Sequence, residues 1–476
     1  MNNWMKNIMF LAVIIIAANV HGQTFGNEWI NYNQQYYSFN VFPENQPLWG
    51  VYGDEQRIES GIQILDYNAL NESNIPLTTF SSENIQIFGR EKEIPLYIVD
   101  GGDSSFDPGD YILFYTERND GWLDSNLYSD PDDIGNSRIS LYNDTLEYFF
   151  TWNNSTNNLR YLEEDNSDFT SYTPSDYIIY TKWRSYAEVY NEAERLGEGA
   201  SSFYNRTEGW SSGRPNGAGG ENFNLGSVQI RYPYQGPSVP NVEFKAIQGS
   251  HSNASYTVSG NHHVRWTIGA SNYELADSIW IGYEGVIFEH SFPSILIPSS
   301  GESNLQATMI DDQNAVTDFQ SISNFSFKYA RIPNFDGENK IEFTIVNNPN
   351  EAKIRLDLSN INYNNPIVFV HGDTPKKVSV SPNGGSFTTL ISNSTIGNEQ
   401  HLVYQDSSTI TRVTALAPVG SSGYFTDFSA IPNKEKALLM ITHPELANAS
   451  NLYKDYRSSS AGGNHNVISA DVIELY

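Results

Sequence analysis

The sequence of 476 residues contains no cysteine. The chain therefore has no disulfide, no thiolate ligand for zinc or an iron–sulfur cluster, and no cysteine nucleophile of its own. Basic residues are scarce, since 27 Lys and Arg stand against 56 Asp and Glu, a net charge of −29. A field of that sign repels phosphate backbones, so nucleic-acid binding is not expected. The apolar share of 39% excludes a disordered chain, and the length suits about two to four domains.

Long apolar runs are absent except at the N-terminus. Lys6 precedes an almost unbroken apolar run over residues 8–20, which is too short to span a bilayer. Val20 and Gly22 stand at the −3 and −1 positions of a signal peptidase site. Residues 1–22 are therefore predicted to be a signal peptide, with the mature chain beginning at Gln23. We expect an exported protein of the extracellular space, the cell surface or the periplasm, with no transmembrane segment in the mature chain.

Short apolar stretches separated by turn residues fill the chain from residue 27 to about residue 166. They are rich in β-branched and aromatic residues and bounded by Gly, Pro, Asp and Asn, which favours strands over helices. The stretches cover residues 62–65, 85–88, 96–99 and 111–115. A polar, turn-like segment follows over residues 165–176. We therefore expect an N-terminal β-rich domain over residues 23–165.

Residues 174–432 show a regular alternation of apolar and polar residues. Val242, Phe244 and Ala246, for example, alternate with Glu243 and Lys245. The same pattern recurs at residues 341–345 and 354–358, and further strands are predicted at residues 278–290, 325–331, 367–370 and 402–405. Each alternating stretch places its apolar side chains on one face of a sheet. This spacing predicts one or two antiparallel β-sandwich domains.

The last segment, residues 433–476, changes character. Residues 437–442 form a continuous apolar run, which is typical of a strand in a parallel sheet. Pro444 suits the first turn of a helix, Leu446, Leu452 and Tyr456 follow at helical spacing, and residues 467–468 and 472–473 begin a second strand region. Since a parallel sheet needs helices on both faces, we expect the opening β-α-β unit of a truncated α/β domain. The alternative is that residues 437–476 pack on the sandwich as an appendage.

Histidine and carboxylate groups offer few candidate sites. His262 and His263, with His251 nearby, are adjacent strand residues that point to opposite faces and cannot bind one metal ion. His443 follows the apolar strand, where open α/β sheets place ligand-binding residues. Two acidic turns could bind Ca²⁺, although neither has the EF-hand spacing. One contains Asp103, Asp107 and Asp110, and the other contains Asp130, Asp132 and Asp133. No catalytic or cofactor-binding residue is assigned, and the metal stays unknown.

Four stretches of the sequence carry a family resemblance: residues 110–115 (DYILFY), 119–128 (NDGWLDSNLY), 142–152 (YNDTLEYFFTW), and the join of residues 417–427 (APVGSSGYFTD) to 437–444 (ALLMITHP). They resemble the N-terminal region of the secreted gingipain-type (C25) cysteine peptidases of Bacteroidota. That family includes sortase-like members associated with type IX secretion. The resemblance covers essentially the whole mature chain and implies β-rich domains followed by the start of a caspase-like α/β domain.

The resemblance also implies that the catalytic histidine and cysteine of the family lie downstream of this opening unit. His443 corresponds to the end of the opening strand rather than to the catalytic histidine, and no cysteine is present. The family chemistry requires a thiolate activated by an imidazole. We therefore expect a non-catalytic region of a cysteine-type endopeptidase, whose substrates are proteins or peptides.

Two other functions stay open. The first is a binding or adhesion module, in which aromatic residues such as Trp210, Trp266 and Trp280 hold a glycan or another cell-surface component. The second is a glycoside hydrolase that uses two carboxylates, against which the family resemblance speaks.

Overall fold

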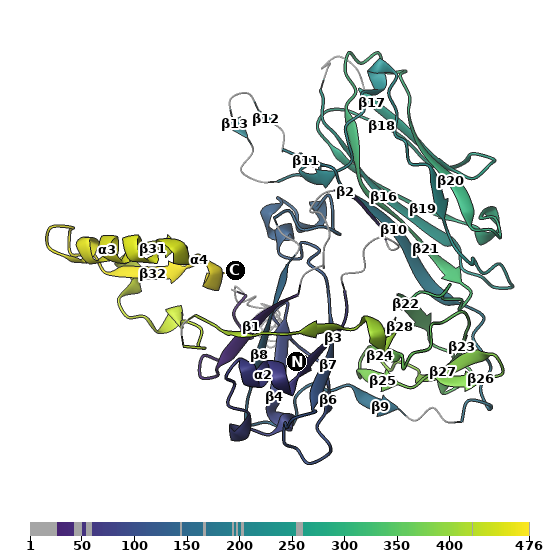
Figure 1. Cartoon of the computed structure of the whole chain (residues 1–476). Coiled ribbons are helices and arrows are strands. Elements are labelled where there is room, and N and C mark those ends of the chain that lie inside the picture. The colour runs from purple at the N-terminus through teal and green to yellow at the C-terminus, as the bar shows by residue number, and fades with distance from the viewer. Residues whose placement is uncertain are drawn as a thin grey trace, which may run out of the picture.

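The computed structural model describes residues 26–41, 50–53, 60–142, 145–164, 168–192, 195–196, 199–200, 204–253, 260–420 and 422–475. The predicted signal peptide lies outside these residues. Within them the chain is mainly β, with antiparallel sheets followed by one β-α-β unit, which confirms the predicted fold class. Figure 1 shows this unit in yellow, standing apart from the sheets at one side of the molecule. None of the helices in the described parts is long and apolar enough to cross a membrane.

The first sandwich consists of two sheets that share one core. One sheet has the strand order β30-β1-β8-β4-β5 and the other β29-β3-β7-β6. Aromatic and β-branched residues at alternate positions, such as Ile85, Ile87 and Phe150, fill the space between them. The strands from the N-terminal part of the chain are β1 (Tyr36–Val41), β3 (Gly61–Asp66), β4 (Ile85–Gly89), β5 (Lys92–Ile94), β6 (Leu96–Val99), β7 (Tyr111–Thr116) and β8 (Leu146–Trp152), and helix α2 (Tyr67–Glu72) follows β3.

The first sandwich is completed by strands from much later in the chain. β29 (Thr411–Val413) pairs in parallel with β3, and β30 (Ala417–Pro418) pairs antiparallel with β1. We call residues 411–420 and 422–425 the strap, because they run from one sheet of the first sandwich to the other. The expected range 174–432 thus contributes two strands to the sheets formed by residues 23–165.

A ten-stranded sheet is the largest sheet of the described residues, and with the smaller sheets packed on it we call it the second part of the molecule. Its strand order is β19-β16-β21-β10-β22-β28-β24-β25-β9, with β2 paired to β10 outside this path. Its strands are β2 (Gly50–Gly53), β9 (Leu162–Glu164), β10 (Ile178–Ala187), β16 (Val242–Ser250), β19 (Gly285–Phe292), β21 (Gln320–Arg331), β22 (Lys340–Val346), β24 (Ile367–His371), β25 (Lys376–Val378) and β28 (Glu399–Gln405). β10 meets β22 through the single pair Ile179↔Thr344.

Two smaller sheets cover the ten-stranded sheet. The sheet β15-β20-β17-β18 lies over the β16–β21 end, where Phe244, Trp266 and Phe327 form the core, and the sheet β23-β27-β26 covers the β22–β28 end. Their strands are β15 (Ser227–Gln229), β17 (His262–Ile268), β18 (Tyr273–Trp280), β20 (Glu302–Met309), β23 (Lys353–Leu358), β26 (Ser381–Asn383) and β27 (Ser386–Ser392). Two short hairpins complete the part, β11 (Val189–Asn191) with β14 (Gly209–Ser211) and β12 (Arg195–Leu196) with β13 (Gly199–Ala200).

The C-terminal unit has the predicted β-α-β order. β31 (Leu438–Thr442) and β32 (Val467–Asp471) pair in parallel, and α3 (Ala447–Ser458) connects them. The prediction that residues 472–473 belong to a strand region is wrong, because they open the short helix α4 (Val472–Leu475). The physical reason is the length of the partner strand, since Thr442, the last residue of β31, already pairs with Asp471.

Candidate functional site

The β-α-β unit leaves one face of its small sheet uncovered. The Thr442 hydroxyl lies 2.5 Å from the Ser450 hydroxyl of α3, so the even-numbered side chains of β31 face the helix. Leu439 and Ile441 point to the opposite face and are 61% and 56% exposed. Each element of an α/β domain buries its apolar face against another. The exposed face therefore marks a sheet that needs a second covering layer.

His443 stands at the carboxyl end of β31, where the sequence places it. Its Nδ1 accepts a hydrogen bond from the backbone N–H of Glu445 at 3.3 Å, which caps the turn Pro444–Leu446. Asp471 ends the neighbouring strand β32. Ligands of open α/β sheets bind at this edge. Within this chain, however, His443 has no thiol to activate, and its observed role is that of a cap.

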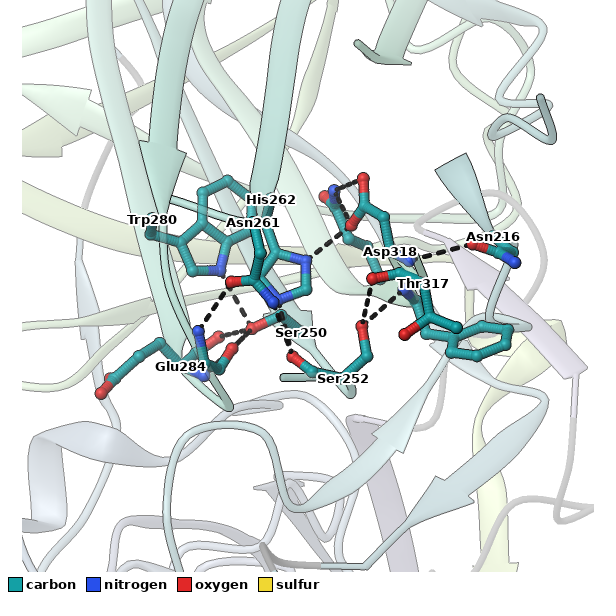
Figure 2. Close-up of polar contacts among 12 residues, drawn as sticks. Asn216, Ser250, Ser252, Asn261, His262, Trp280, Glu284, Thr317 and Asp318 are labelled. Carbon is teal, nitrogen blue, oxygen red and sulfur yellow. Dashed lines mark hydrogen bonds and ion pairs between the residues drawn. The ribbon is translucent and has the colours of Figure 1, made fainter. Parts of the chain in front are cut away.

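His262 and its polar partners form a buried cluster at one end of the sandwich formed by β16, β17 and β21 (Figure 2). His262 of β17 is fully buried, its Nδ1 lies 2.6 Å from Oδ1 of Asp318, and its Nε2 lies 2.9 Å from the backbone oxygen of Ser252. The Ser252 hydroxyl donates to the backbone oxygen of Thr317 at 3.3 Å, and Asn216 Oδ1 accepts from the backbone N–H of Asp318 at 2.9 Å. Asp318 and Ser252 thus bond the two nitrogens of one imidazole, and Thr317 and Asn216 bond these two partners in turn.

The His262 geometry supports a structural role rather than catalysis. A carboxylate oxygen and a carbonyl oxygen lie within hydrogen-bond distance of the two ring nitrogens, so both nitrogens face groups of the protein itself. A general base needs a free ring nitrogen within reach of a proton on a substrate or nucleophile. Neither nitrogen of His262 is free. The same end of the sandwich is closed by Ser250, whose hydroxyl accepts from Trp280 Nε1 at 3.0 Å and from the backbone N–H of Glu284 at 3.0 Å.

The neighbouring histidines do not join His262 in a metal site. His263 points to the other face, where its ring nitrogens lie 2.9 Å from Asp312 Oδ1 and 2.8 Å from Asp277 Oδ1. Burial alone would lower the pKa of His263, but the two carboxylates outweigh it and raise that pKa. Burial lowers the pKa of His251 to about 3, and its Nε2 lies 2.7 Å from the Ser321 hydroxyl. Among the described residues, no group of three or more His, Asp or Glu side chains is placed to hold a metal ion.

The two acidic turns use their carboxylates as local caps. Asp110 accepts from the backbone N–H of Asp107 at 2.5 Å, and Asp130 accepts from the backbone N–H of Asp132 at 3.1 Å. Asp133 forms an ion pair with Arg206. Carboxylates at turns commonly bond nearby backbone amides in this way. The structure assigns no Ca²⁺ ligand in either turn.

The tryptophans predicted to hold a ligand divide into two kinds. Trp266 is fully buried and its Nε1 donates to Gln248 Oε1 at 2.9 Å, so its prediction as a surface ligand-binding residue is wrong. Trp266 points from β17 into the space between the two sheets of the sandwich, so it belongs to the core. Trp210 is half-buried in the hairpin β11–β14 and meets the Tyr190 ring edge to face at 5.4 Å. Nearby Tyr142 is 60% exposed.

Sequence reasoning missed a partly buried titratable cluster between the first sandwich and the ten-stranded sheet. The Ser60 hydroxyl donates to Glu342 Oε1 at 2.8 Å, and His401 Nε2 lies 3.7 Å from Glu342 Oε2. Burial would raise the pKa of Glu342, but His401, Lys340 and Ser60 lower it to about 2. Burial lowers the pKa of Lys340 to about 8. The alternation of β22 indicated a polar face but not that this face is covered.

Comparisons with known proteins give little further support. No family model and no curated protein sequence matches the chain. Among solved structures, dimeric latent PorU from Porphyromonas gingivalis is similar, with 11% identity and a TM-score of 0.48 over 92% of this chain and 37% of that chain. A VP2 subviral particle of infectious bursal disease virus follows, with 10% identity and a TM-score of 0.17 over 78% of each chain. At these TM-scores the likenesses carry no argument about function.

Proposed function

We propose that this chain is the exported, non-catalytic N-terminal region of a gingipain-like cysteine peptidase. Its β-sandwiches carry the first β-α-β unit of a caspase-like α/β domain, and its signal peptide is residues 1–22. The family resemblance of the sequence motivates the proposal. The observation that carries it is the uncovered face of the parallel sheet β31–β32, with Leu439 and Ile441 at its centre.

The chemistry divides the work between this chain and the rest of the peptidase. Peptide hydrolysis by this family requires a thiolate and an imidazole, and the chain has no thiol. The role left to this chain is to present and orient the sheet on which further strands and their catalytic groups assemble. The substrates of the whole peptidase are then proteins or peptides, and sortase-like processing in type IX secretion is the specific activity that the resemblance favours.

Peptidase assays on two forms of the protein test the proposal. One form is the chain as printed, and the other adds the residues that the source gene encodes in frame after Tyr476. We expect the longer form to cleave a peptide library in an iodoacetamide-sensitive reaction and the printed chain to be inactive. Iodoacetamide-sensitive activity of the printed chain, or none in the longer form, would refute the proposal.

A pair of variants in the longer form tests the uncovered sheet face directly. We expect Ile441→Asp to lower peptidase activity at least tenfold, because a charge on this face opposes its burial under a covering layer. Val316→Asp is the matched control, since Val316 is an apolar side chain that is 80% exposed in the second part of the molecule. Equal activities of the two variants would show that the face is not covered.

Binding of a cell-surface glycan is the second candidate function, and one observation favours it. Four aromatic side chains gather beside the hairpin β11–β14, namely Trp210, Tyr190, Tyr204 and the exposed Tyr142. The hydroxyls of Tyr142 and Tyr204 lie 2.9 Å apart. Aromatic faces with hydroxyl groups at their edges suit sugar rings. A glycan array is expected to lose its signal with Tyr142→Ala and to keep it with Tyr363→Ala, a tyrosine that is 44% exposed elsewhere. No signal with the parent chain would rule this function out.

A further inference from the structure

His371 lies where the first sandwich meets the ten-stranded sheet. It ends β24, and its ring centroid is 4.7 Å from that of Tyr115 in β7. On another side, its Nδ1 is 3.4 Å from the hydroxyl of Tyr161, whose ring stacks on Phe369 at 3.8 Å. Ile62, Leu113 and Val403 complete the apolar part of this contact. We call the contact between these residues the joint.

The surroundings of His371 accommodate a neutral ring. The Nε2 atom is buried and has no hydrogen-bond partner among the residues that the structure describes. A protonated imidazole carries N–H groups on both nitrogens, so its second N–H would be buried without an acceptor. Leaving such a group unsatisfied costs more than an ordinary hydrogen bond returns.

The other titratable groups around His371 come from both sides of the joint. Tyr115 and Tyr161 face it from the first sandwich and the connecting segment, and His401, Glu342 and Lys340 come from β28 and β22. Burial first, and the neighbouring His401 second, lower the pKa of His371 to about 3, although Glu342 acts in the opposite direction.

We propose that the joint is an acid-sensitive contact between the first sandwich and the ten-stranded sheet, which protonation of His371 opens. The opening separates β3 and β7 from β24 and β28, and it leaves the strands within each sandwich paired. The proposal concerns the described joint alone and does not depend on the proposed peptidase function.

The direction of the effect follows from linkage. His371 is neutral in the closed joint, and in an open joint its pKa returns to about 6.5, the ordinary value. The closed joint is therefore fully stabilised above pH of about 6.5 and loses stability as the pH falls toward 3. Between pH 7.5 and 5.0 the open fraction is expected to rise about 30-fold. Glu342 adds little in this interval, because its pKa in the closed joint, about 2, and the ordinary glutamate value both lie below pH 5.0.

Hydrogen exchange followed by mass spectrometry tests the proposal on the whole chain. The Ile62 N–H donates to Gln405 Oε1 across the joint at 2.7 Å, so β3 peptides report opening. After correction for the chemical exchange rate, we expect the Ile62 amide, resolved from overlapping β3 peptides, to lose about 30-fold in protection from pH 7.5 to 5.0, while β3 amides bonded to β7 keep theirs. Peptides of β8, in the other sheet of the first sandwich, should keep theirs. Unchanged Ile62 protection, or an equal loss in β8, would overturn the proposal.

Two variants and one control separate titration from packing. His371→Phe keeps a ring in the joint but cannot be protonated, so the pH-dependent loss in β3 should disappear. His371→Gln gives the same test if the first variant fails to fold. The control is His443→Gln, which removes an exposed histidine outside the joint and should behave as the parent chain. A 30-fold loss that persists in both His371 variants would contradict the proposal.

Discussion

The buried amide of Asn136 is one of the groups that hold the long loop between β7 and β8 against the ten-stranded sheet and the β11–β14 pair. Asn136 is 2% exposed, and its Nδ2 donates to the backbone oxygens of Tyr186 and Trp210 at 3.1 Å each, while its Oδ1 accepts from the Ser185 hydroxyl at 2.8 Å. We expect Asn136→Ala to lower the free energy of unfolding by about 2–4 kcal/mol, because buried carbonyl groups lose their donors. Urea denaturation measures this change.

The exposed Asn350 is the control for this substitution. Its alanine variant should change the free energy of unfolding by less than about 0.5 kcal/mol, as surface substitutions usually do. If both asparagine variants unfold alike, the loop does not depend on the buried amide.

His263 should make the free energy of unfolding depend on pH in the opposite direction to the effect of His371 on the joint. Its pKa is raised by Asp312 and Asp277 against the effect of burial. A raised histidine pKa contributes stability that is complete below about pH 6.5 and is lost as the pH rises through the raised value. The difference in urea midpoint between the parent chain and His263→Leu should therefore shrink from pH 6 to pH 9. A difference that stays constant across this range would show that the ring contributes packing alone.

At the scale of elements, the ring of Phe425 adds an aromatic contact to the strand pairing that holds the strap on the first sandwich. Phe425 meets Trp29, Tyr36 and Phe149 with ring centroids 5.6, 5.1 and 5.4 Å away. We expect Phe425→Ala to lower the unfolding free energy by about 1–3 kcal/mol, because this half-buried ring loses its aromatic contacts. It should also speed trypsin cleavage at Lys434 and Lys436, which lie between the strap and β31.

The neighbouring Tyr424, 43% exposed, supplies the matched control. Tyr424→Ala should leave both the stability and the cleavage rate near those of the parent chain. Faster cleavage in the control than in Phe425→Ala would mean that the ring cluster does not hold the strap.

The strands that could be predicted are those whose pattern is local. Alternation over five or more residues located β16, β22 and β23, and a continuous apolar run located β31. The two strap strands were not predicted, because they are three and two residues long and carry no period of their own. They form only because partners in β3 and β1, some 350 residues away along the chain, are in place, as the Arg412–Asp66 pair shows.

The candidate sites were harder to predict than the fold for the same reason. The two faces of β17 separate His262 from His263, which period-two geometry requires. The partners that define each ring, Asp318 for His262 and Asp312 for His263, come from another segment. The joint around His371 combines β3, β7, β24 and β28, and no spacing within one of these strands signals it.

At the scale of the whole molecule, the first sandwich is predicted to be incomplete without the strap. A fragment of residues 23–165 lacks Val413, Leu416 and Val419, which are buried in the complete chain. We expect a synthetic peptide of residues 409–425 to raise the melting temperature of this fragment by about 5 °C, because ligand binding stabilises the folded state. The same peptide with Leu416→Asp and Val419→Asp should have no effect. A fragment that melts cooperatively at a temperature unaffected by either peptide would contradict the role of the strap.

The strap also sets the order in which the protein can fold. A ribosome makes β1 and β3 first, yet their edge partners β30 and β29 follow hundreds of residues later, as the separation of 387 residues between Gln35 and Ser422 illustrates. Such distant pairing gives high contact order and slow folding, with sheet edges that stay open in the meantime. The first sandwich therefore cannot complete its folding when only its N-terminal strands have been synthesised. Its folding waits for the strap, which favours a chain kept unfolded by chaperones until β29 and β30 have been synthesised.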